Sequence, residues 1–146
     1  MAKADFYLID KPRFREEPLL LVCELARKSH DAGFATLILV RNMAQAEALD
    51  DLMWSFDPDA FIPHQIAGLA QEDEDDEDDL APVLILPPES DAPLRPLVIN
   101  LRDAPVEGDF ERVLEVVPAD PAARAPLRER WKHYQSRGLQ LAKHDM

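Results

Sequence analysis

Apolar and polar residues repeat with two different periods along this chain, and the changes of period mark the predicted secondary structure. Residues 4–10 alternate from one position to the next and are rich in β-favouring side chains, which predicts a first strand. Residues 34–40, 82–86 and 97–101 are almost wholly apolar, as strands buried on both faces of a sheet usually are. Residues 110–118 fit a helix or a strand, and the closely spaced valines in their second half favour a strand there.

Three segments are predicted to be helices: residues 18–33, 42–56 and 120–138. The first two show the three- and four-residue apolar spacing of amphipathic helices. The first has a proline in its opening turn and a glycine at its end. The third is the best delimited, because Asp120 suits the N-cap, a proline follows it, and a glycine closes the segment. Pro126 lies inside this span and is expected to delay or kink the start of the helix.

The segments between these elements are polar or rich in proline. Residues 11–17 are interpreted as a polar connector, and residues 57–68 as a loop or a short strand. Residues 72–79 are eight consecutive Asp and Glu residues. Because like charges repel and cannot pack, we expect a mobile, solvated loop at residues 70–81.

The order of these elements predicts the fold class. Strands alternate with helices, and several strands are apolar without alternation. That pattern is typical of a three-layer, Rossmann-like α/β domain around a mostly parallel central sheet. With 146 residues, the chain has the length of one ordinary domain, so residues 1–146 are expected to form a single unit.

Composition narrows the class of protein. The single cysteine, Cys23, excludes an internal disulfide and a cysteine-rich zinc site, and it is expected to be buried as a small apolar residue. No signal peptide and no apolar run of membrane-spanning length is visible, which predicts a soluble cytoplasmic protein without a membrane partner.

Charge is distributed unevenly. The formal net charge is −13, which argues against a broad grip on nucleic acid, because such binding needs neutralised phosphates. Residues 122–146 hold six cationic side chains against two carboxylates, a local charge of +4, which leaves −17 for the other 121 residues. A small positive site on a negative body can bind a short anionic partner while repelling long polyanions.

Sequence motifs for catalysis or cofactor binding are missing. The connections after the first two strands contain no glycine and neither of the phosphate-binding glycine patterns, so no nucleotide-binding loop is expected. The four histidines have no metal-ligand spacing, and no nucleophile motif occurs. His64 is the one candidate for a hidden catalytic base, although a hydrogen-bonded histidine in a turn is the more common arrangement. We therefore expect no catalytic residues, no metal and no cofactor.

The predicted last helix carries the most distinctive chemistry. Arg124, Arg128 and Lys132 recur every four residues and so share one helical face, with Trp131 beside them. Such a row suits a short peptide that carries carboxylates and one apolar anchor. The same pattern also fits an ordinary C-terminal helix whose cations offset the helix dipole and whose aromatic residues belong to the core. The pattern alone leaves both interpretations open.

Four segments, in this order, resemble the chi subunit of bacterial DNA polymerase III holoenzyme: "FYLID", "LVCELARK", "LDDLMWSFDPDAFIPHQIAG" and "LRERWKHYQSRG". The resemblance extends over nearly the whole chain. The resemblance implies a non-catalytic clamp-loader subunit with a Rossmann-like fold and no nucleotide site. It also implies two partners, namely the psi subunit and the acidic C-terminal tail of single-stranded-DNA-binding protein, in the replisome at the bacterial nucleoid. The acidic run 72–79 is not part of the family pattern.

The resemblance further implies two sets of site residues. The tail-binding site would use Arg128, Lys132, Trp131, Val117 and Arg124. The psi-binding site would use Trp54, Phe61 and Pro63. DNA would then be contacted only indirectly, and direct binding of single-stranded DNA by the basic and aromatic last helix remains the alternative.

Overall fold

The computed structural model describes residues 2–55, 64–67, 82–88 and 94–145. The acidic loop expected at residues 70–81 lies outside the described residues.

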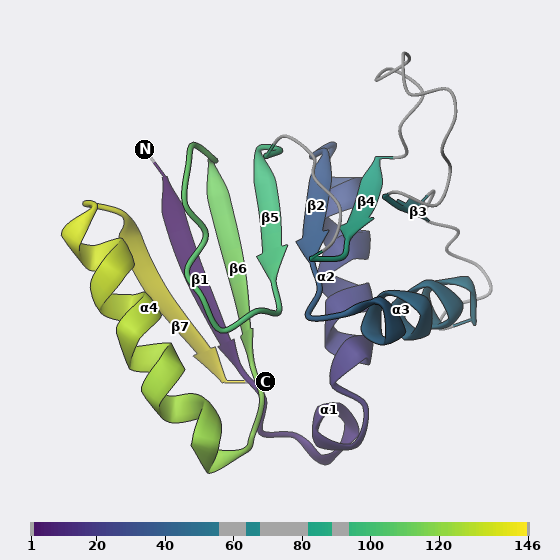
Figure 1. The fold of residues 1–146 in the computed structure, drawn as a ribbon, viewed down its shortest axis with the longest axis horizontal. Helices are drawn as coiled ribbons and strands as arrows, with labels where there is room; N and C mark the ends of the chain where they lie inside the picture. Colours follow the sequence, from purple (N-terminus) through teal and green to yellow (C-terminus); the bar gives the residue numbers. More distant parts are fainter. Residues whose placement is uncertain (1, 56–63, 68–81, 89–93, 146) are drawn as a thin grey trace.

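The described strands form one sheet in which every pairing is parallel, in the order β3–β4–β2–β5–β6–β1–β7 (Figure 1). The sheet confirms the predicted α/β class. The strands are β1 (Lys3–Leu8), β2 (Thr36–Leu39), β3 (His64–Ile66), β4 (Val83–Leu86), β5 (Leu97–Asn100), β6 (Arg112–Val117) and β7 (Gln140–Asp145).

Helices cover both faces of this sheet, which gives the three predicted layers (Figure 1). The helices α1, α2 and α3 lie on one face, whereas α4 lies on the other, over β1, β6 and β7. Their bounds are α1 (Pro12–Glu16), α2 (Pro18–Asp31), α3 (Met43–Ser55) and α4 (Arg124–Ser136), with a short 3₁₀ turn, η2 (Pro121–Ala123), directly before α4.

The larger of the two cores lies under α1, α2 and α3. The central strands contribute fully buried side chains such as Ile38, Ile85 and Ile99, and the amphipathic stripe of α2 packs on them. Cys23 is buried in this core, as expected, and burial raises the pKa of its thiol to about 12.

The second core is covered in a different way, because α4 spans only part of that face. Over β1 and β6 the cover is α4, whose Tyr134 is fully buried. Over the rest of this face of the sheet, residues of connecting segments pack into the core, namely Leu94, Val106 and Phe110. The last helix therefore contacts the sheet along one side, where Arg130 and Tyr134 are buried, and its exposed residues lie on its other sides.

Two elements differ from the sequence expectation. Residues 11–17 were expected to be a polar connector, but they contain α1, because the side chain of Phe14 is buried in the first core. The strand β7 was not expected at all, since its half-exposed residues show no apolar run. It forms because the edge of β1 has free hydrogen-bonding groups, and β7 pairs with that edge.

Asp120 was predicted to cap the last helix, but it caps the 3₁₀ turn η2 that precedes α4. The Asp120 carboxylate accepts a hydrogen bond from the Ala122 N–H at 2.9 Å, as an N-cap does. The chain then makes the 3₁₀ turn before α4 begins at Arg124. Pro126 falls in the first turn of α4, where no backbone N–H needs a partner inside the helix, so the helix is not interrupted. Within the described part of the chain, no helix combines the length and apolar character needed to cross a bilayer.

Candidate functional site

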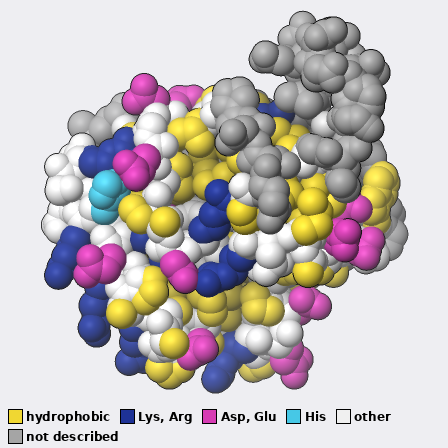
Figure 2. Space-filling view, in the orientation of Figure 1, with side chains coloured by type: hydrophobic (Ala, Val, Ile, Leu, Met, Phe, Trp, Pro, Cys, Tyr) yellow, Lys and Arg dark blue, Asp and Glu magenta, His cyan; other side chains and the backbone are white. Residues whose placement is uncertain are grey.

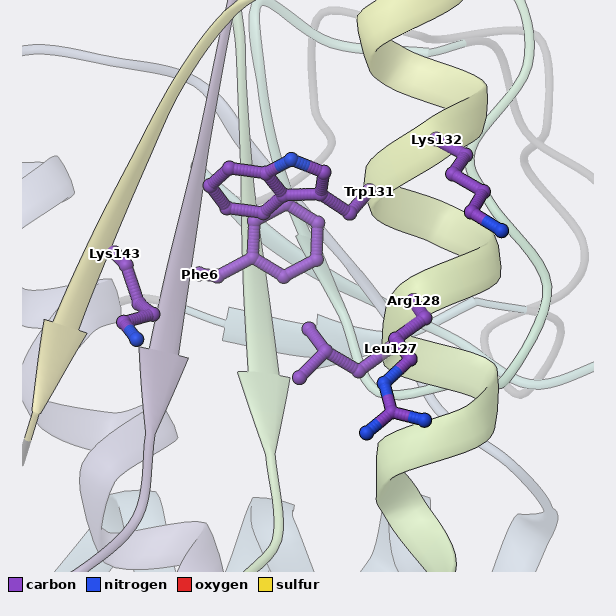
Figure 3. Close-up of a pocket in the computed structure, with 6 residues that line it drawn as sticks. All are labelled: Phe6, Leu127, Arg128, Trp131, Lys132 and Lys143. Atoms are coloured by element: carbon purple, nitrogen blue, oxygen red, sulfur yellow. The ribbon is translucent and has the colours of Figure 1, made fainter.

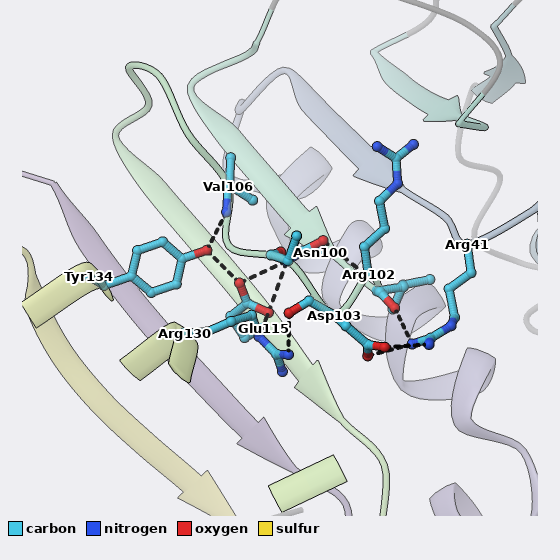
Figure 4. A network of polar contacts seen from close by, with 10 residues as sticks. Arg41, Asn100, Arg102, Asp103, Val106, Glu115, Arg130 and Tyr134 are labelled. Atoms are coloured by element: carbon cyan, nitrogen blue, oxygen red, sulfur yellow. Dashed lines mark hydrogen bonds and ion pairs between the residues drawn. The ribbon is translucent and has the colours of Figure 1, made fainter. Parts of the chain in front are cut away.

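Parallel α/β sheets usually bind ligands beyond the carboxyl ends of their strands, so this edge comes first. Here it is occupied by the chain's own arginines (Figure 4). Arg102 donates from Nε to the Val40 carbonyl at 2.8 Å and from Nη2 to the Leu86 carbonyl at 2.9 Å. Arg41 donates to the Leu101 carbonyl at 3.2 Å. These three backbone carbonyls at the edge therefore have internal donors.

A buried ion pair holds α4 against the sheet. Glu115 of β6 is fully buried, and Arg130 of α4 is only 3% exposed. The Arg130 Nε lies 2.8 Å from the Glu115 Oε1, and its Nη1 donates to the Asp103 carbonyl at 3.0 Å (Figure 4). The guanidinium thus ties α4 both to β6 and to the segment that follows β5.

The same carboxylate binds two further donors. Tyr134 donates its hydroxyl proton to the Glu115 Oε2 at 2.5 Å and accepts a hydrogen bond from the Val106 N–H at 2.8 Å. The Asn100 side-chain amide donates to both Glu115 oxygens, at 3.1 and 2.9 Å. Burial raises the pKa of Glu115, and the charge of Arg130 opposes that rise. Burial also raises the pKa of Tyr134, next to the same carboxylate.

On the side of α4 that faces β1 and β7 there is a pocket of about 360 Å³ (Figure 3). Its apolar wall consists of Phe6, Leu127 and Trp131. Leu127 and Trp131 are one helical turn apart, and the Trp131 ring packs against the Phe6 ring with 5.1 Å between centroids and 47° between planes.

Three cationic side chains line the same pocket: Arg128 and Lys132 from α4, and Lys143 from β7. All three are exposed. In the part of the chain that the structure describes, none of them forms a hydrogen bond or ion pair with another side chain. Lys and Arg side chains also follow the flank of the molecule occupied by α4 in the space-filling view (Figure 2). The pocket therefore combines an apolar wall with positive charge that the protein itself does not neutralise.

The structure brings together part of the predicted tail-binding set. Arg128, Trp131 and Lys132 line the pocket. Val117 does not line it, because its side chain is 3% exposed and lies in the second core, against which Trp131 packs. Arg124 is exposed as the first residue of α4 and is not a lining residue either.

Three lining residues were not found from the sequence: Phe6, Leu127 and Lys143. Leu127 lies four positions before Trp131, and this helical spacing could have indicated it. Phe6 belongs to the predicted first strand, but nothing in that strand points to α4. Nothing in the sequence indicated Lys143 as a pocket residue, because the strand β7 that carries it was not predicted. Conversely, the sequence counted Arg130 as part of the basic surface, whereas Glu115 neutralises it inside the protein.

Of the residues predicted for the psi-binding site, the structure describes only Trp54, which belongs to α3 on the opposite side of the sheet. Trp54, near the end of α3, is 57% exposed, and its ring lies 5.0 Å from the His64 ring. Phe61 and Pro63 lie outside the described residues. His64 Nε2 is 3.0 Å from the Asp50 Oδ1, and the His64 side chain is fully buried. This is the arrangement of a packed structural histidine, which gives the hidden catalytic base no support.

The fold and the pocket define the general class of the protein: it is a Rossmann-like parallel α/β domain that carries an apolar pocket flanked by cations. Known structures agree with the fold. The chain is similar to the C-terminal domain of the DEAD-box protein Dbp5, with a TM-score of 0.69 and 13% identity over 99% of this chain and 90% of that one. It is also similar to S. cerevisiae Dbp5 bound to Nup159, Gle1, IP6 and ADP, with a TM-score of 0.64 and 12% identity over 97% of this chain and 41% of that one. At these identities the similarity concerns the fold alone.

Sequence comparison then identifies the family. A family model described as "DNA polymerase III chi subunit, HolC" matches residues 1–142. The DNA polymerase III subunit chi of Pseudomonas aeruginosa is 35% identical over 99% of this chain and 96% of that protein. The subunit of the same name from Escherichia coli (strain K12) is 31% identical over 97% of this chain and 96% of that protein. The chain belongs to the DNA polymerase III chi subunit family, which confirms the resemblance noted in its sequence.

Proposed function

We propose that this chain is a non-catalytic adaptor of the replisome, which binds the acidic C-terminal tail of single-stranded-DNA-binding protein in the pocket beside α4. The observation that carries the proposal is the composition of that pocket: an apolar wall of Phe6, Leu127 and Trp131 next to cations without internal partners. An acidic tail that ends in an apolar residue and a free carboxylate is complementary to both parts.

The volume of the pocket supports a short ligand. About 360 Å³ holds one or two apolar side chains and not a folded domain. The net charge of −13 supports the same view, because a long polyanion would be repelled by the rest of the molecule. The adaptor is thereby directed to a peptide and contacts DNA only through the protein that coats it.

The second partner in this proposal is psi, which would link the chain to the clamp loader through the surface around Trp54. A tryptophan that is 57% exposed on a helix is the type of residue that forms hot spots in protein interfaces. This surface and the pocket lie on opposite faces of the sheet, because α3 and α4 do. Both partners could therefore be bound at the same time.

Titration of the full chain with a synthetic peptide of the tail tests the main proposal. We expect micromolar affinity, about −8 kcal/mol, that weakens as salt is added. Arg128→Ala should weaken binding about tenfold or more, and Lys132→Glu should weaken it as well. The matched control is Arg15→Ala on α1, which removes an exposed arginine on the other face of the sheet and should leave the affinity unchanged. Equal binding by Arg128→Ala and the unmodified chain would remove the site from consideration.

The same titration with a bare oligonucleotide tests direct binding of single-stranded DNA. Base stacking needs an open aromatic face, whereas the Trp131 ring is half buried and already packs on Phe6. We expect the oligonucleotide not to bind at concentrations at which the tail peptide saturates the pocket. Tight binding to the oligonucleotide would favour the alternative function.

A further inference from the structure

The strand β7 adds a cation to the pocket that no helical pattern could indicate. In the parallel pairing of β1 with β7, Lys143 stands directly opposite Phe6. Aligned residues on neighbouring parallel strands project from the same face of a sheet. Lys143 therefore enters the pocket from the sheet side, next to the aromatic wall, while Arg128 enters it from the helix.

The three cationic side chains are placed differently relative to the apolar wall of the pocket. Arg128 and Lys143 lie on opposite sides of the apolar wall, with Leu127 and Phe6 between them (Figure 3). The Lys132 side chain leaves α4 in another direction, and its ammonium points away from Phe6 and Trp131 (Figure 3). The cations that flank the apolar wall are thus Arg128 and Lys143.

Neither flanking cation is engaged by the protein. Both are exposed, and within the described residues neither makes a hydrogen bond or an ion pair through its side chain. Three arginines elsewhere in the chain do have carboxylate partners: Arg41 pairs with Asp103, Arg112 with Asp5, and Arg130 with Glu115. A carboxylate that reached either side of the pocket would therefore meet a charge that has no competing internal partner.

We propose that Lys143 is a second carboxylate-binding residue, so that Arg128 and Lys143 bind two carboxylates on either side of one apolar side chain. The inference rests on the proposed function and specifies its ligand: a peptide end with an apolar residue between its terminal carboxylate and an acidic side chain. The planar guanidinium can bind one carboxylate through two parallel hydrogen bonds, and the compact ammonium supplies a point charge for the other. Because the two cations come from α4 and β7, the ligand connects the helix to the edge of the sheet.

The test is a set of titrations of the full chain with the tail peptide in three forms: unmodified, amidated at its C-terminus, and with its acidic side chains replaced by amides. Lys143→Ala should weaken binding of the unmodified peptide roughly fivefold, as partly exposed charge pairs do. It should have a clearly smaller effect on one of the two altered peptides, namely the one that lacks the carboxylate paired with Lys143. Lys28→Ala on α2 is the matched control, because it removes an exposed lysine on the other face of the sheet.

A second measurement separates contact from long-range attraction. Binding of the unmodified peptide should slow amide hydrogen exchange in β7, and this protection should be reduced in Lys143→Ala. If Lys143→Ala matches Lys28→Ala in all titrations, the inference is wrong while the proposed function survives. If the unmodified chain does not bind the tail peptide, the proposed function and the inference fail together.

Discussion

The inner and outer sides of α4 carry the same residue type in opposite roles. Arg130 faces the sheet, is 3% exposed, and pairs with the fully buried Glu115. Arg128, only two positions earlier, is exposed beside the pocket and has no side-chain partner within the described residues. A difference of two positions turns a helical residue by about 200°, which moves it from the core to the surface.

This contrast shows how charge can be divided between stability and binding within one helix. A buried cation with a buried partner stabilises the packing only while both are present, because each alone would be an uncompensated charge. An exposed cation contributes little to stability, and its charge remains available for a ligand. The inner pair places α4, and the outer residues can then bind a ligand from a defined position.

Arg130→Ala should have the largest effect, because it leaves the Glu115 carboxylate buried without its counter-charge. We expect the free energy of unfolding to fall by about 3–5 kcal/mol. Urea denaturation followed by circular dichroism measures the loss. Arg128→Ala in the same assay is the control for removing an arginine from the same helix.

Replacing both members of the buried pair sharpens this prediction. The double variant Arg130→Met with Glu115→Gln contains no buried charge at this place and has side chains of similar volume. It should recover much of the stability lost in Arg130→Met alone. A double variant that is as unstable as the sum of its single variants would mean that the two residues are not coupled.

Tyr134→Phe should have an intermediate effect. The change keeps the buried ring but removes the hydroxyl that bonds the Glu115 carboxylate and the Val106 N–H, so both lose a partner. We expect a loss of about 1–3 kcal/mol in the free energy of unfolding. A loss below about 0.5 kcal/mol would show that water or a shifted neighbour replaces the hydroxyl.

The free energy of unfolding should depend on pH through Glu115, which pairs with the inner side of α4. Burial raises the pKa of Glu115 above its ordinary value of 4.5. As the pH rises past that value, the unfolded chain releases this proton first, while the folded chain still holds it. The contribution of Glu115 to the free energy of unfolding should therefore decrease from about pH 4.5 up to the folded pKa and stay constant above it. Unfolding of the unmodified chain and of Glu115→Gln across this range measures the difference.

Arg128→Ala should have the smallest effect on stability, within about 0.5 kcal/mol of the unmodified chain. The affinity of the same variant for the tail peptide is expected to fall about tenfold or more. A large change in the unfolding midpoint would contradict the division between the two sides of α4, since it would give Arg128 a structural role.

Sequence patterns were sufficient for most of the fold. Apolar runs located the buried strands at residues 34–40, 82–86 and 97–101. Asp120 with its proline located the 3₁₀ turn η2, and α4 itself begins four residues after Asp120, at Arg124. These features depend on neighbours along the chain, so they can be recognised locally. The strand β7 escaped, because an edge strand that is half exposed has no strong apolar signature.

The candidate site was predictable only on its helical side. The four-residue spacing of Arg128 and Lys132, with Trp131 beside them, follows from helical geometry and is visible in the sequence. The sequence therefore determined that the last helix presents cations and an aromatic residue together. The absence of glycine after the first two strands predicted that no ordinary nucleotide loop follows them.

Tertiary structure alone decided which cations remain available and what they surround. Glu115 lies 15 positions before Arg130 in the chain, and only the packing of α4 on β6 joins them and removes Arg130 from the surface. Phe6 and Lys143 come from opposite ends of the chain, and they meet only because β7 pairs with β1. Burial and pairing depend on residues that are distant in sequence, and for this reason a local pattern could reveal half of the pocket and not its other wall.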